Sequence, residues 1–271
     1  RRQHPDRIGE IGVGLIILIH RHGTRLRERP KQGICHGIAI ALILQMIAAQ
    51  QAGSMARTTI TLSSRNYSSW SLRGWLMAKQ SGVPFTEIMV APDDLDARAE
   101  ILLLSPSILV PCLEYEGIKI WDTLAIGEFL NEIAPKSGLL PKDRAKRAHC
   151  RSISGEMHSG FSALRSALPM NLRARFPNFK VWSKADADIA RIATIWNECL
   201  RAYGGPFLFG EFSMADAMYA PVATRFVTYD VKLDAACAGY RDRVLAWPAM
   251  QEWTDTALEE PEEIEELEVE F

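Results

Sequence analysis

The stretch of residues 59–76 constrains the fold more strongly than any other part of this sequence. Its β-branched start favours a strand, and an apolar pattern with helical spacing begins at Leu72. Between the two lies a polar loop that ends in Ser68-Ser69-Trp70-Ser71. Serine is favoured at helix N-termini, where free backbone N–H groups and the helix dipole attract anions. We therefore predict a strand, a hydroxyl-rich turn and a helix whose start faces a bound anion.

The residues on either side of this turn predict an α/β domain over residues 55–137. Glu116-Gly117 separates two short apolar runs and has the form of a two-residue hairpin turn. Gly82 and Pro84 end the first helix, and Asp122-Thr123 begins the last one. The predicted order is β-α-β-α-β-β-α, with strands at 58–62, 85–90, 109–115 and 118–121 and helices at 71–81, 94–104 and 122–133.

Beyond Pro141 the hydrophobic spacing is helical throughout, which predicts an all-helical domain over residues 142–260. Ser213 followed by Asp216 has the form of a capping box at the start of an apolar helix. The other predicted helices cover 142–168 as one long helix, 184–203, 235–247 and 248–259. Residues 261–271 form an acidic tail, to which we assign no function. The fold class is therefore α/β followed by all-α.

The first 54 residues differ in character from the rest of the chain. Their two apolar runs, at 11–19 and 37–49, are shorter than the roughly 20 residues that a membrane-spanning helix needs. Arg21-His22-Gly23 resembles the signature of histidine phosphatases, but the apolar and proline-containing surroundings do not fit that domain. We expect a non-native or disordered extension, with the functional protein beginning at Met55 and without a membrane anchor.

Composition excludes some classes of function. A net charge of −2 gives no reason to expect binding to nucleic acid, which usually goes with a basic surface. The five cysteines are scattered and lack the spacing of a metal site, so we expect no bound metal and reduced thiols in a cytoplasmic protein. Cys112 has neither a partner cysteine nor a basic neighbour in the sequence, and we interpret it as a buried strand residue.

Three motifs, in this order and spacing, resemble those of a known family. Ser68-Ser69-Trp70-Ser71 before Leu72-Arg73 looks like a serine loop, Val110-Pro111 looks like a cis-proline before a strand, and residues 122–126 (Asp-Thr-Leu-Ala-Ile) look like a ligand-binding turn. The chain from Met55 onward resembles the soluble, cytosolic-type glutathione S-transferases, in particular bacterial serine-type members, and is nearest in motif to the zeta and theta classes. The resemblance implies a thioredoxin-like domain followed by an all-helical domain.

The resemblance also implies a function and its residues. Glutathione would be the co-substrate, a small hydrophobic electrophile the second substrate, detoxification the role and a homodimer the assembly. Ser68 matches the catalytic serine, whose hydroxyl stabilises the thiolate. A thiol near pKa 8.5 is mostly protonated at neutral pH, and one hydrogen bond with a helix N-terminus could lower its pKa by roughly one to two units. The residues expected to bind glutathione are Ser69, Val110, Pro111, Asp122 and Thr123.

Departures from the family pattern leave alternatives open. Ile108-Leu109 stands where a Gly-Lys or Gly-Arg pair is common, so a cation for the glycyl carboxylate is missing, which favours a non-enzymatic protein-interaction scaffold. Trp70 replaces the cysteine of the zeta loop, which weakens the other alternative, a maleylacetoacetate isomerase-like cis-trans isomerase. Five residues are candidates for the electrophile site between the domains: Met157, Phe161, Met170, Arg173 and Phe176.

Overall fold

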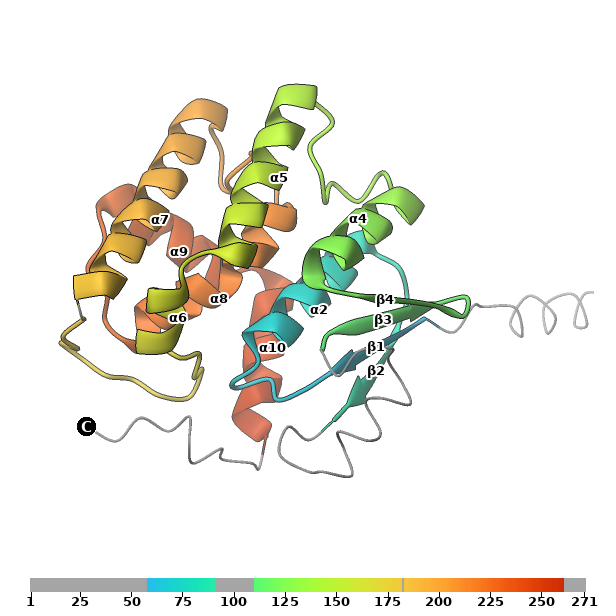
Figure 1. Cartoon of the computed structure of the whole chain (residues 1–271), viewed down its shortest axis with the longest axis horizontal. Helices are drawn as coiled ribbons and strands as arrows, with labels where there is room; N and C mark the ends of the chain where they lie inside the picture. Colours follow the sequence, from blue (N-terminus) through green and yellow to red (C-terminus); the bar gives the residue numbers. More distant parts are fainter. Residues whose placement is uncertain (1–57, 91–109, 182, 261–271) are drawn as a thin grey trace, which may run out of the picture. The chain divides into compact units, whose positions relative to one another are not determined.

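The computed structural model describes residues 58–90, 110–181 and 183–260 (Figure 1). Contacts between Cα atoms divide the chain into Arg1–Met55 and Ala56–Phe271, and every described residue belongs to the second unit. The predictions for the extension, the helix at 94–104, Ile108-Leu109 and the acidic tail fall outside the described residues.

The described strands form a four-stranded mixed sheet in the order β2-β1-β3-β4. β1 pairs in parallel with β2, whereas β3 runs antiparallel to both β1 and β4. Glu116 and Gly117 join β3 to β4 with φ values of 51° and 81°, as a two-residue hairpin turn requires. The strands are β1 (Thr59–Leu62), β2 (Thr86–Met89), β3 (Cys112–Tyr115) and β4 (Ile118–Trp121).

Two helices of the sheet-bearing part end where the sequence predicts, but α2 begins two residues before the predicted start at residue 71. Ser68 caps the start of α2 (Ser69–Ser81), and Gly82 ends that helix with a φ of 72°. Asp122 caps α4 (Thr123–Ile133) with its side chain. The helices α2 and α4 pack against each other, with α4 following directly on β4 (Figure 1). The predicted α/β arrangement is thereby confirmed over the described residues.

The helical part follows the prediction with one correction. Residues 142–168 do not form one helix but two, α5 (Arg144–Ser159) and α6 (Ser162–Ala167). Gly160 leaves the helix in an extended conformation, and Phe161 takes a left-handed φ of 57° that places its ring in the core. The other helices are α7 (Ser183–Tyr203), α8 (Met214–Thr228), α9 (Ala235–Leu245) and α10 (Pro248–Glu259).

Helix α8 lies at the centre of this unit and is buried along almost its whole length. It starts at the predicted capping box, in which the Asp216 carboxylate accepts the backbone N–H of Ser213 at 2.8 Å. It packs against α2, α5 and α9, and α10 returns to pack against α2 (Figure 1). One cluster of buried apolar side chains therefore runs from the sheet through α2 into the helical part, and it fixes the start of α2.

Candidate functional site

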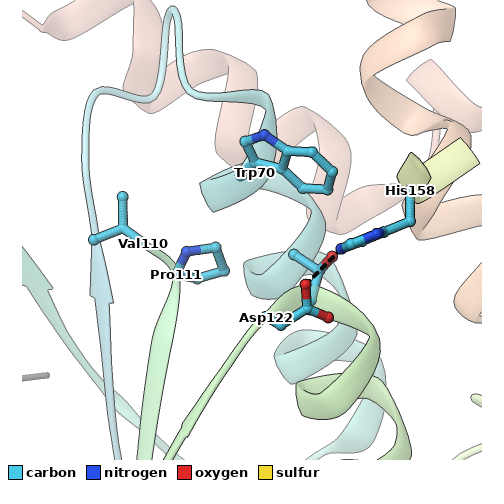
Figure 2. Close-up of a pocket in the computed structure, with 6 residues that line it drawn as sticks. Trp70, Val110, Pro111, Asp122 and His158 are labelled. Carbon is cyan, nitrogen blue, oxygen red and sulfur yellow. Dashed lines mark hydrogen bonds and ion pairs between the residues drawn. The ribbon is translucent and has the colours of Figure 1, made fainter. Parts of the chain in front are cut away.

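A pocket of about 240 Å³ lies where the start of α2, the residues before β3, the start of α4 and the end of α5 meet (Figure 2). Four predicted site residues, Val110, Pro111, Asp122 and Thr123, are brought together here although the chain separates the two pairs by a hairpin. The described residues that line it are Trp70, Val110, Pro111, Asp122, Thr123 and His158.

Ser68 occupies the N-cap position of α2, two residues before the pocket-lining Trp70. Its Oγ accepts the backbone N–H of Ser71 at 3.2 Å and lies 2.9 Å from the Ser71 Oγ. Ser71 is fully buried, and its Oγ accepts the backbone N–H of Ser63 at 3.0 Å. Hydroxyl hydrogens rotate, so Ser71 can donate to Ser68 and leave the Ser68 proton for a ligand. In this arrangement the Ser71 hydroxyl donates a hydrogen bond to Ser68, and the Ser68 hydroxyl donates one to the ligand.

Ser68 and Ser69 are not among the described residues that line the pocket. Ser69 is buried, and its Oγ lies 3.5 Å from Nη1 of Arg73, one helical turn further on. Trp70 is the residue of this turn that forms a wall of the pocket. The serine turn therefore reaches the described lining of the pocket through Trp70.

The peptide bond between Val110 and Pro111 is cis, as the sequence predicts. Pro111 is buried against Gly74 of α2, where an added Cβ would come within 2.5 Å of the proline Cγ. Only glycine allows α2 and the proline to approach so closely. This contact connects the helix that carries the serine turn with the backbone that lines the pocket.

Asp122 and Thr123 form the opposite wall at the start of α4. Asp122 has a φ of 73°, rare for a residue other than glycine, and its Oδ1 accepts the backbone N–H of Leu124 at 2.8 Å. The Thr123 hydroxyl is buried and has no hydrogen-bond partner among the described residues. A buried hydroxyl without a hydrogen-bond partner lowers the stability of the fold unless a bound ligand supplies the missing hydrogen bond. A helix N-terminus beside that hydroxyl suits a carboxylate.

His158, on α5, is a site residue that the sequence did not reveal. Its Nε2 lies 2.5 Å from Oδ2 of Asp122, and its ring meets the Trp70 ring edge-on, with centroids 5.2 Å apart (Figure 2). In the sequence it occupies one polar position of an amphipathic helix, 36 residues after its partner. No local pattern could have joined the two.

Arg73 adds a buried positive charge behind Trp70. It is fully buried, its Nε donates to the carbonyl of Met218 at 2.8 Å, and its guanidinium carbon lies 4.4 Å from the centroid of the Trp70 ring. Its Nη2 has no hydrogen-bond partner among the described residues. Burial, followed by the nearby charges of Arg225 and Arg165, holds the pKa of Arg73 well below its usual range. The buried guanidinium of Arg73, next to Trp70, therefore favours an anion bound in the pocket.

The five residues predicted to line an electrophile site do not line this pocket. Met157, Phe161 and Met170 belong to the hydrophobic core, where each has at most 7% of its surface exposed. Phe176 stacks on Tyr229, and Nη1 of Arg173 donates to the Glu260 carbonyl at 2.9 Å. Trp70 supplies the apolar wall in their place.

The described cysteines are buried. Cys112 lies on β3 with 2% of its surface exposed, as the sequence predicts. Burial raises the pKa of the Cys150, Cys199 and Cys237 thiols to about 12 in each case. Within the described ranges, no group of three or more histidine, cysteine or acidic side chains is arranged to hold a metal ion. Nor does any helix there have the length and apolarity needed to cross a bilayer.

Comparisons with known proteins agree with this geometry. Two family profiles match, "Glutathione S-transferase, N-terminal domain" at residues 67–133 and "Glutathione S-transferase, C-terminal domain" at residues 181–256. A rat maleylacetoacetate isomerase is 32% identical over 62% of this chain and 78% of its own length. A probable maleylacetoacetate isomerase from Caenorhabditis elegans is also 32% identical, but the match spans 40% of this chain and only half of the nematode protein.

The solved structures show the same fold. A glutathione transferase homolog from Burkholderia with bound glutathione superposes with a TM-score of 0.59 at 21% identity, covering 75% of this chain and all of the other. The fold, both domain profiles and the rat relative point to one conclusion. The chain belongs to the glutathione S-transferase family, whose enzymes use glutathione as co-substrate.

Proposed function

We propose that this protein binds glutathione in the described pocket and activates its thiol with Ser68. The γ-glutamyl end would lie at Asp122 and Thr123, the peptide backbone would pair with Val110 beside Pro111, and the thiol would point to the start of α2. This orientation uses the four lining residues that the sequence predicts. An extended tripeptide pairing with exposed backbone is a common mode of peptide recognition. Ser69 would contribute by supporting the serine turn.

The single observation that carries this proposal is the buried Thr123 hydroxyl, which has no partner among the described residues. It lines the pocket at the N-terminus of α4, where the backbone N–H groups carry partial positive charge. The γ-glutamyl carboxylate would accept from this hydroxyl, while the neighbouring ammonium would lie against Asp122. A zwitterionic amino-acid end is therefore complementary to this wall.

The reaction that the site supports best is conjugation. The thiolate attacks an electrophilic carbon, a sulfur–carbon bond forms, and the leaving group departs with its electron pair. Ser68 would donate a hydrogen bond to the sulfur and lower the thiol pKa by about one unit, which corresponds to about 1.4 kcal/mol. The second substrate would pack on Trp70, an apolar wall that favours hydrophobic electrophiles. Catalysis would consist of activation and positioning.

A second candidate is a glutathione-dependent cis-trans isomerase. The names of two relatives favour it: the rat protein is called maleylacetoacetate isomerase, and the nematode protein is called probable maleylacetoacetate isomerase. In this reaction the thiolate adds to a conjugated double bond, rotation follows, and the same sulfur leaves with its electron pair. Ser68 would stabilise the thiolate in both reactions, so the two candidate functions differ in the substrate that the protein turns over.

We further propose that the protein acts in detoxification as a cytoplasmic homodimer. The buried thiols are compatible with a reducing compartment. Trp121 and Ile118, at the two ends of β4, are 42% and 53% exposed, and an interface that covered either side chain would bury apolar surface. Light scattering of the wild type and of Trp121→Glu tests the dimer, which the charged variant should weaken.

The function is tested by measuring glutathione binding and turnover of two substrates with the full chain. A generic aryl halide reports conjugation, and a cis-enedione acid reports isomerisation. We expect conjugation that falls at least tenfold in Ser68→Ala. Turnover of the enedione alone would favour the isomerase, and the absence of glutathione binding would reject both reactions in favour of a scaffold.

A further inference from the structure

His158 connects the helical part of the protein to the wall of the pocket. Its Nε2 lies 2.5 Å from Oδ2 of Asp122. An ionised carboxylate only accepts hydrogen bonds, so Nε2 must carry a proton in this pair. The other oxygen, Oδ1, is occupied by the backbone N–H groups of Leu124 and Ala125. Oδ2 is therefore the oxygen that both His158 and a bound ammonium would share.

The groups around His158 make Asp122 its dominant electrostatic partner. From α2, Trp70 meets its ring, and the guanidinium carbon of Arg73 lies 4.4 Å from the centroid of that tryptophan. From α6, the guanidinium carbon of Arg165 lies 5.6 Å from the same centroid. The remaining charged groups near this end of α5 have other partners. Glu156 binds Arg191 of α7, and Tyr219 of α8 donates to the carbonyl of Ile153.

We propose that His158 is a positioning residue that makes glutathione binding depend on pH through Asp122. This inference rests on the proposed function, in which Asp122 takes the γ-glutamyl ammonium. Neutral His158 donates one hydrogen bond, holds the carboxylate in place and leaves the pair with one negative charge. Protonated His158 cancels that charge and repels the ammonium. Affinity for glutathione therefore falls when His158 gains its second proton.

The test needs a ligand whose own charge is constant. Histidine is the side chain that changes charge between about pH 5 and 8, but the bound thiol of glutathione also titrates in this range. S-Methylglutathione lacks the ionisable thiol and keeps its ammonium and carboxylates. Its dissociation constant, measured by calorimetry between about pH 5.5 and 7.5 with the full chain, isolates the ion pair.

We expect the dissociation constant of the wild type to rise about two- to fivefold as the pH falls over this range, as for other partly exposed ion pairs. His158→Gln, which keeps a neutral donor, should still bind S-methylglutathione but lose this dependence on pH. His149→Gln is a matched control, because His149 is on the same helix and pairs with the Tyr203 hydroxyl at 2.7 Å. This variant should retain the wild-type dependence.

Two results would overturn the inference. One is a wild-type dissociation constant that does not change with pH, and the other is an unchanged dependence in His158→Gln. In both cases S-methylglutathione still binds and the proposed function is unaffected. If the wild type does not bind S-methylglutathione at the higher pH, the proposed function fails and the inference fails with it. Asp122→Asn is the second variant, and it should bind weakly at every pH without the dependence.

Discussion

Glu260, just after α10, accepts the backbone N–H of Arg65 at 2.6 Å, although 195 residues separate them in the sequence. The same carboxylate accepts the Ser64 hydroxyl at 2.8 Å and the backbone N–H of Asn66 at 3.1 Å. Arg65 also pairs with Glu87 of β2 and stacks on Trp253 of α10. The loop before Ser68 is thus held by the end of the helical part.

This contact predicts that Glu260→Gln destabilises the serine turn. An amide offers one acceptor oxygen in place of two, so one or two of the three hydrogen bonds are lost. We expect a loss of about 1–3 kcal/mol in the free energy of unfolding, because hydrogen bonds to a charged group are involved. Urea denaturation measures it. The neighbouring Glu259→Gln changes an exposed side chain, and an equal loss there would contradict the assignment.

Gly74→Ala tests the contact between α2 and Pro111. The new Cβ would lie 2.5 Å from the proline Cγ, so Pro111 and the pocket wall must shift. We expect a loss of about 1–3 kcal/mol in stability and weaker glutathione binding. Gly155→Ala in α5 is the matched control, since its Cβ meets no atom within 4 Å. That variant should gain about 0.5–1 kcal/mol, because alanine is the better helix former.

Asp216 predicts a pH dependence of stability. Burial raises its pKa to about 6, although Ser213, Leu208 and Tyr240 donate to the carboxylate. Since the folded pKa exceeds the unfolded one, its contribution is fully present below about pH 4 and is lost as the pH rises through about 6. The contribution that is lost amounts to about 3 kcal/mol at most.

The measurement compares urea unfolding of the wild type and Asp216→Asn at several pH values. The stability gap between them should shrink as the pH rises from about 4 to 7. Asp230→Asn should behave oppositely, because the hydrogen bond from Lys232 lowers the pKa of that exposed carboxyl. The stability difference between the wild type and Asp230→Asn should shrink as the pH falls. A gap for Asp216→Asn that widens with pH would refute the expected sign.

Local chemistry explains how much of this fold the sequence predicts. Gly82 marks the end of α2 and Glu116-Gly117 marks the hairpin, because caps and turns depend on neighbouring residues. Among the three serines at the start of α2, the sequence did not single out Ser68 as the cap. The break after Ser159 could not be predicted, since Phe161 takes its left-handed conformation where the core buries its ring. In the candidate site, too, the sequence reveals what neighbouring residues determine but not what tertiary packing determines. Its two-residue motifs are visible in the sequence, whereas His158 reaches Asp122 only through the packing of α5 near α4.

The central claim is that the Ser68 hydroxyl stabilises the glutathione thiolate. The most direct measurement is the pKa of the bound thiol, obtained from thiolate ultraviolet absorbance as a function of pH in the wild type, Ser68→Ala and the control Ser69→Ala. We predict that Ser68→Ala raises this pKa by about one unit while Ser69→Ala leaves it nearly unchanged. A bound thiol that titrates identically in Ser68→Ala and the wild type would contradict this claim.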